Sequence, residues 1–122
     1  MGGRPVELRV DDGLARVTLN QPTKGNVFSQ DSSRQFCDAV TAIVDRADVR
    51  AVLIAGRGKN FSFGGDLDGI TGNLDRLPAY LRGLTADLHL AMARLARIDA
   101  PVIVQVQGFA MGGAVALIAS CD

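Results

Sequence analysis

Apolar and polar residues alternate at the start of the chain. Val6, Leu8 and Val10 are separated by charged residues. An Asp-Gly pair at positions 12–13 then precedes a second short apolar segment over residues 14–19. Period-two alternation on both sides of an Asp-Gly pair is typical of a β-hairpin, so the first twenty residues are predicted to form two antiparallel strands.

Two longer segments carry apolar residues at helical spacing. The first begins after Ser29, a good N-cap residue, and is predicted to extend to about Asp48. Its apolar stripe consists of Phe36, Val40, Ile43, Val44 and Ala47. The second has Pro78 in its first turn and returns to leucine or methionine at steps of three and four as far as Leu95. Both segments are predicted helices.

Two short runs rich in β-branched residues, 49–56 and 102–106, are predicted strands. Each ends in a glycine-rich loop, and the second loop opens a helix of small residues near Gly112. Hairpin, helix, strand, helix, strand and helix in this order predict an α/β domain with a largely parallel sheet flanked by helices. Ligands of such sheets bind beyond the carboxyl ends of the strands, so the two glycine loops are the predicted site.

The composition of the 122 residues fits one globular domain. Thirteen basic residues balance thirteen acidic ones, and the chain has one Tyr and no Trp, which disfavours nucleic-acid binding. Every apolar run is too short to span a membrane. Cys37 and Cys121 are interpreted as small buried hydrophobic residues, and a cytoplasmic location is expected.

The glycine loops do not match the common phosphate-binding signatures. A P-loop would need glycine at Leu53 and a hydroxyl at Asn60, and the dinucleotide fingerprint fails at Phe61. No G-x-S-x-G elbow and no metal-ligand spacing occur, so no metal site is predicted. The lone His89 is interpreted as an ordinary helix residue. A site made of backbone N–H groups at glycine and a helix N-terminus remains.

Three segments resemble consecutive motifs of the crotonase superfamily, the enoyl-CoA hydratases, isomerases and their relatives. They are NQPTKGNVFS at 20–29, NFSFGGDL at 60–67 and APVIVQVQGFAMGGAVALIASCD at 100–122. The resemblance covers essentially the whole chain and implies a crotonase-like ββα spiral. Residues 1–122 would be the N-terminal portion of that core, with the C-terminal part of the fold absent. The full-length protein would be a homotrimer or hexamer.

The resemblance also implies site residues. Gly65 and Gly113 would donate the two N–H groups of an oxyanion hole that holds an acyl-CoA thioester; the alternative is that a tight turn requires these glycines. The groove for the adenine end of coenzyme A would be lined by Lys24, Gly25, Asn26, Val27 and Phe63, where Gly25 and Phe63 replace the more usual Leu and Ala. Coenzyme A enters as part of the substrate, so no separate cofactor is expected.

Two carboxylate positions bear on the reaction. Ala116 stands where the hydratases carry a Glu, so the resemblance favours double-bond isomerisation over hydration. Asp66 is interpreted as a helix N-cap and not as the catalytic acid. The carboxylate that isomerases of the family use would lie beyond Asp122. Two alternatives stay open: a non-catalytic, truncated CoA-binding fragment, or a scaffold domain.

Overall fold

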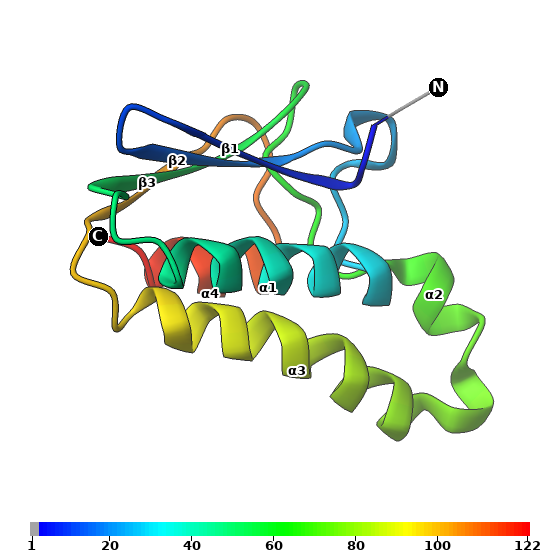
Figure 1. The fold of residues 1–122 in the computed structure, drawn as a ribbon. Coiled ribbons are helices and arrows are strands. Elements are labelled where there is room, and N and C mark those ends of the chain that lie inside the picture. The colour runs from blue at the N-terminus through cyan, green and yellow to red at the C-terminus, as the bar shows by residue number, and fades with distance from the viewer. Residues whose placement is uncertain (1–2) are drawn as a thin grey trace.

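The computed structural model describes residues 3–122, in which helices cover one face of a four-stranded sheet (Figure 1). The strands, in their order across the sheet, are β1 (Val6–Asp11), β2 (Leu14–Leu19), β3 (Ala51–Gly56) and β4 (Val102–Gln105). β1 and β2 pair antiparallel, whereas β3 and β4 run parallel to β2. The predicted α/β fold, a hairpin followed by parallel strands, is confirmed.

The hairpin turn has the geometry that its two residues favour. Asp12 and Gly13 both have positive φ, at 49° and 83°. Positive φ at both central residues is the requirement of a type I′ turn, whose twist matches that of the flanking strands. The Asp-Gly pair therefore sets the register in which Asp11 faces Leu14.

The helices follow the predicted segments with shifted ends. They are α1 (Gln30–Val44), α2 (Leu67–Thr71), α3 (Leu77–Leu95) and α4 (Gly113–Ala119), with 3₁₀ turns η1 (Pro22–Lys24) and η2 (Leu74–Arg76). Ser29 caps α1 in a capping box with Ser32, and Pro78 lies in the first turn of α3. α1 ends four residues before the predicted Asp48, because the Arg46 N–H donates to the Ile43 carbonyl in a tight turn.

Two predicted strand limits were also wrong by one or two residues. β3 begins at Ala51 and not at Val49, because the N–H groups of Arg50 and Ala51 both donate to the Gly13 carbonyl before the regular ladder starts. β4 ends at Gln105, one residue early. Beyond it the Gln107 side chain donates to the Gly56 carbonyl at 2.6 Å, so the chain has already turned toward β3.

The main core lies between the sheet and α1, and α3 packs beneath α1 (Figure 1). Its fully buried side chains include Val17, Phe36, Val40, Val52 and Ile54. Cys37 is buried as predicted, while Cys121 is only half-buried. Burial raises the pKa of both thiols, which keeps them protonated at neutral pH. No helix within residues 3–122 has the length and apolar character needed to cross a membrane.

The opposite edge of the molecule exposes apolar side chains. β4 is an edge strand of the sheet, and Ile103 on it is 51% exposed. Val106 follows it at 43% exposed, and Val115 on α4 is 53% exposed. Three large apolar side chains are thus exposed on β4, just after it and on α4.

Candidate functional site

The loops that follow β3 and β4 pair with each other. The Phe61 N–H donates to the Gln107 carbonyl at 2.8 Å, and the Met111 N–H donates to the Ser62 carbonyl at 3.1 Å. A parallel bridge joins Ser62 to Ala110. The two glycine loops therefore meet beyond the carboxyl ends of the parallel strands, where the sequence predicts the site.

Hydrogen bonds to Phe28 fix the orientation of the backbone around Gly65. Phe28 donates to the Gly64 carbonyl at 2.7 Å and accepts from the Asp66 N–H at 3.1 Å. In this parallel bridge Gly65 contributes neither bond, so its own N–H points away from Phe28. Among residues 3–122 it has no hydrogen-bond acceptor.

Gly113 lies at the start of α4, on the neighbouring loop. Its N–H belongs to the first turn of the helix and has no intrahelical acceptor, and no other acceptor within the described chain replaces it. A Cβ placed on the preceding Gly112 would lie 3.9 Å from the Gly65 nitrogen. The structure thus brings the Gly65 and Gly112–Gly113 segments into contact.

The backbone conformations that require glycine occur at Gly64 and Gly112, the residues just before the two predicted site residues. Gly64 has φ 87°, and a Cβ on it would lie 2.5 Å from the Met111 carbonyl oxygen. Gly112 has φ 57°. Gly65 and Gly113 do not have positive φ, and the atom nearest to a Cβ on Gly65 would be 3.7 Å away. A tight turn therefore requires Gly64 and Gly112 but does not require Gly65.

A groove of about 1210 Å³ runs along the paired loops. It is bounded by the η1 segment, the glycine loops and α2. Residues from all three line it, among them Lys24, Val27, Phe63, Gly65, Asp66 and Ile70. Three of the five residues expected to contact coenzyme A, Lys24, Val27 and Phe63, thus lie on one groove together with Gly65.

Gly25 lies beneath the ring of Phe63 and does not line this groove. A Cβ on Gly25 would overlap the ring atom Cδ2 of Phe63, and the Phe63 N–H donates to the Gly25 carbonyl at 2.9 Å. The ring of Phe63 also packs against Phe109, with 5.8 Å between the ring centroids. The unusual Gly25 and Phe63 are therefore complementary, because the missing side chain makes room for the larger one.

Asn26 turns its side chain into the protein and away from the groove. It is 3% exposed. Its amide nitrogen lies 2.9 Å from the Arg57 carbonyl and 3.1 Å from the Phe61 carbonyl, and its amide oxygen accepts from the Gln21 N–H at 2.7 Å. Asn26 thus ties the η1 segment to the loop after β3. Its backbone has a positive φ of 51°, a conformation that asparagine tolerates better than most residues.

Replacing Asn26 with alanine is expected to lower the free energy of unfolding by about 2 kcal/mol, because buried backbone carbonyls lose their donor. Urea denaturation measures the change. Asn20→Ala is the matched control, since the Asn20 amide bonds only to Arg4 and Glu7 near the surface. Equal effects of the two substitutions would contradict the role assigned to Asn26.

Asp66 occupies the N-cap position of α2, but its side chain makes no capping hydrogen bond. Asp66 therefore has the predicted N-cap position, but the predicted hydrogen bond between its carboxylate and the helix is absent. Its oxygen Oδ2 instead lies over Gly69, close to the hydroxyl of Tyr80. Burial, and then the negative charge of Asp66, raise the pKa of Tyr80, while Arg76 opposes the shift. The sequence analysis did not single out Tyr80.

Other candidates lie outside the groove. His89 is exposed on α3, in agreement with its interpretation as an ordinary helix residue. Ala116 is exposed on α4. Within residues 3–122, no group of three or more His, Cys, Asp or Glu side chains is placed to hold a metal ion.

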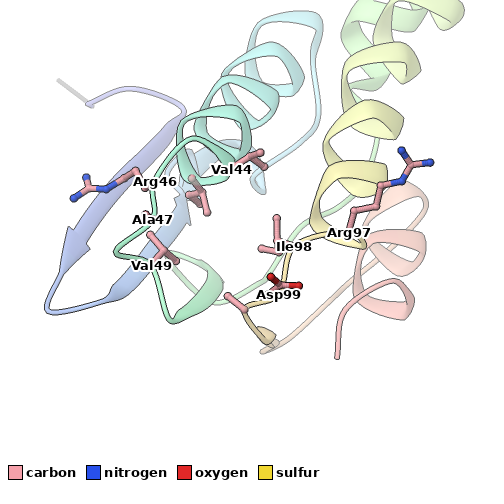
Figure 2. A pocket seen from close by; sticks show the side chains of 9 residues that line it. Val44, Arg46, Ala47, Val49, Arg97, Ile98 and Asp99 are labelled. Carbon is pink, nitrogen blue, oxygen red and sulfur yellow. The ribbon is translucent and has the colours of Figure 1, made fainter.

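A second hollow, of about 410 Å³, lies between the end of α1 and the connection from α3 to β4 (Figure 2). Arg46 and Arg97 lie on its rim with their guanidinium groups directed outward, and Arg46 is paired with Asp48 at 2.7 Å. The hollow is at the start of β3 and β4, far along the strands from the glycine loops. Asp99 also lines the hollow, and its other lining side chains are apolar.

Comparison with known proteins decides the family. The family model described as enoyl-CoA hydratase/isomerase matches residues 9–122. The chain belongs to the enoyl-CoA hydratase/isomerase family. The predicted crotonase-like fold is thereby confirmed for the N-terminal part: an enoyl-CoA hydratase from Shewanella pealeana superposes with a TM-score of 0.89 at 25% identity, covering 98% of this chain and 45% of that one.

Similar members of the family differ in reaction. The chain is 32% identical over 117 residues to the human mitochondrial Delta(3,5)-Delta(2,4)-dienoyl-CoA isomerase, covering 89% of this chain and 36% of that protein. It is 28% identical over 112 residues to 4-chlorobenzoyl coenzyme A dehalogenase-2 of Arthrobacter, covering 91% of this chain and 41% of that protein. The chain thus spans less than half the length of these relatives. The expected cytoplasmic location stays a prediction.

Proposed function

We propose that the chain forms the oxyanion hole of an acyl-CoA enzyme, in which the N–H groups of Gly65 and Gly113 bind the thioester oxygen. The observation that carries this proposal is at Gly65. Its N–H has no acceptor among residues 3–122, the residue lines a large groove, and its backbone does not need glycine. A small residue is needed there if another molecule must approach the backbone closely.

The chemistry of such a hole follows from where charge develops. When a base removes a proton from the α or γ carbon of the acyl chain, the electron pair moves onto the thioester oxygen. Two N–H donors that already face this oxygen stabilise the enolate without reorganisation, and each contributes about 3 kcal/mol. The start of α4 adds the positive end of its backbone dipoles beside Gly113.

The coenzyme A part of the substrate would lie along the η1 side of the groove. Lys24 brings a positive charge that suits the phosphates of coenzyme A, while Val27 and Phe63 offer apolar contacts. Gly25 and Asn26 would act indirectly: Gly25 leaves space for the ring of Phe63, and Asn26 holds the loop in place. Coenzyme A is part of the substrate and no further cofactor is proposed.

We expect the intact protein to isomerise a 3-enoyl-CoA faster than it hydrates a 2-enoyl-CoA, because Ala116 provides no carboxylate to activate water. The two thioesters would be offered separately to the purified protein. Loss of the 2-enoyl absorbance reports hydration, and chromatography of the thioesters reports the double-bond shift. Rapid hydration of the 2-enoyl-CoA would contradict the preference for isomerisation.

The alternative function is a CoA-binding fragment or scaffold without catalysis. It is favoured by the exposed apolar side chains of β4 and α4. Binding of butyryl-CoA without exchange of its α protons for deuterium would support this alternative. Exchange together with binding would support the enzyme.

For the longer protein, we propose that residues 1–122 are the N-terminal portion of a crotonase-like core. The remaining part of the fold would cover Ile103, Val106 and Val115. The assembly is proposed to be a homotrimer or hexamer, which light scattering on the intact protein measures.

A further inference from the structure

The side chains that line the groove differ in character from one element to the next. Those from η1 include polar and charged residues such as Thr23 and Lys24. Those from α2 and from the loop after β4 include three large apolar ones, Leu67, Ile70 and Met111. The groove therefore has an apolar part, contributed by the two segments next to the proposed oxyanion hole.

Ile70 and Met111 lie close to the position proposed for the thioester. A Cβ on Gly65 would lie 3.7 Å from Cδ1 of Ile70. Met111 directly precedes Gly112, whose Cβ position is 3.9 Å from the Gly65 nitrogen. A thioester oxygen bound to the Gly65 N–H would thus place the first carbons of the acyl chain beside these two apolar side chains.

Met111 has a fixed backbone and an exposed side chain. Its N–H donates to the Ser62 carbonyl and its carbonyl accepts from the Ala114 N–H, both at 3.1 Å. Its side chain is 48% exposed, and that of Leu67 at the start of α2 is 72% exposed. An aliphatic chain in the groove would cover both side chains, and removing apolar surface from water favours binding.

Two carboxylates accompany this apolar part. Asp66 and Asp68 line the groove, and neither forms an ion pair with another residue of the described chain. Of the described residues that line the groove, only Lys24 is basic, and it lies on η1. An acyl group with its own carboxylate would add a third negative charge near two unpaired ones, which is repulsive.

A positively charged acyl group is also disfavoured. An ammonium group would suit the two carboxylates, but it would have to lose water against Leu67, Ile70 and Met111. Burying a charge against apolar side chains is costly unless the charge is fully paired. An uncharged aliphatic chain meets neither penalty.

We propose that Leu67, Ile70 and Met111 form an acyl subsite that selects uncharged aliphatic acyl groups longer than four carbons, and that Asp66 and Asp68 exclude acyl groups that carry a carboxylate. The subsite rests on the proposed function of the groove, since it assumes that the thioester oxygen binds the Gly65 N–H. It adds the chemical class of the acyl group to that function.

Titration calorimetry on the intact protein tests the selectivity. The affinity is expected to rise about twofold to fourfold per added methylene from butyryl-CoA through hexanoyl-CoA to octanoyl-CoA, where fourfold corresponds to a fully buried methylene. Glutaryl-CoA resembles hexanoyl-CoA in length and is expected to bind about tenfold more weakly than it. β-Alanyl-CoA, which has an ammonium group in place of the terminal methyl group of butyryl-CoA, is expected to bind more weakly than butyryl-CoA.

Substitutions at exposed positions test the apolar side chains without disturbing the core. Leu67→Gln and Met111→Gln are each expected to lower the affinity ratio of hexanoyl-CoA to butyryl-CoA toward one. Leu74→Gln is the matched control, because Leu74 is also exposed but lies on η2 and does not line the groove. It is expected to keep the ratio of the unaltered protein.

The charges are tested with a double variant. Asp66→Asn combined with Asp68→Asn is expected to raise the affinity for glutaryl-CoA relative to hexanoyl-CoA about threefold to tenfold. Asp75→Asn removes a charge from η2 outside the groove lining and is expected to leave this ratio unchanged. An equal effect of Asp75→Asn would show that the net charge of the protein, and not the two groove carboxylates, sets the preference.

The outcomes separate this subsite from the proposed function. Equal affinities for the butyryl, hexanoyl and octanoyl thioesters would overturn the subsite, and so would a glutaryl-CoA affinity that matches that of hexanoyl-CoA. Tighter binding of β-alanyl-CoA than of butyryl-CoA would overturn it as well. Each of these results leaves the oxyanion hole standing, because the thioesters still bind. If none of the thioesters binds, both proposals fail.

Discussion

Replacing Gly113 with proline is expected to lower the rate of acyl-CoA turnover about 10²- to 10³-fold while α4 stays folded. Gly113 is the first residue of α4, a position where proline is well tolerated because its N–H would have no intrahelical acceptor. The substitution removes the N–H that is proposed to bind the thioester oxygen. One oxyanion donor is worth about this factor in the rate constant.

Gly113→Ala is the matched control for this experiment. A Cβ at this position lies 3.4 Å from the side chain of Leu88 in either variant, but alanine keeps the N–H. The α-proton exchange of butyryl-CoA in deuterated water, catalysed by the intact protein, measures the rate for both variants, and circular dichroism measures the total helix content. Equal rates in the alanine and proline variants would show that the N–H of Gly113 takes no part in the reaction.

Replacing Gly64 with alanine is expected to lower the free energy of unfolding by about 2–4 kcal/mol, because an L-residue is strained at its φ of 87° and the new Cβ meets the Met111 carbonyl oxygen. The contact is with backbone and cannot be relieved by rotating a side chain. Urea denaturation would show the loss as a lower transition midpoint.

Gly65→Ala provides the contrast. Its Cβ would have only Ile70 nearby, at 3.7 Å, so the expected loss of stability is less than about 1 kcal/mol. The added methyl group would nevertheless stand at the groove wall, and we expect binding of butyryl-CoA to weaken. A large loss of stability in Gly65→Ala would restore the view that the turn itself requires this glycine.

Local signals in the sequence determined most of the fold. The Asp12 and Gly13 pair defined the hairpin, Ser29 defined the start of α1, and Pro78 the start of α3. Each of these features depends on residues that are close together in the chain, so the order of residues alone can predict it. The ends of α1, β3 and β4 were less accurate, because contacts such as that of Arg50 with Gly13 join residues far apart in the chain.

The sequence also placed the candidate site at the two glycine loops, because parallel strands bring their carboxyl ends to one edge. It could not assign separate tasks to adjacent glycines. In the tertiary structure the turns require glycine at positions 64 and 112, whereas Gly65 lines the groove. A glycine has no side chain whose type could indicate its contacts.

By itself, then, the sequence determined the α/β fold, the family resemblance and the location of the candidate site. The tertiary structure alone decided that Asn26 faces the interior, that Phe63 covers Gly25, and that Asp66 turns toward Tyr80. The physical reason is that periodicity and turn chemistry act between near neighbours in the chain. The direction of a side chain depends on packing against segments that only the folded chain brings together.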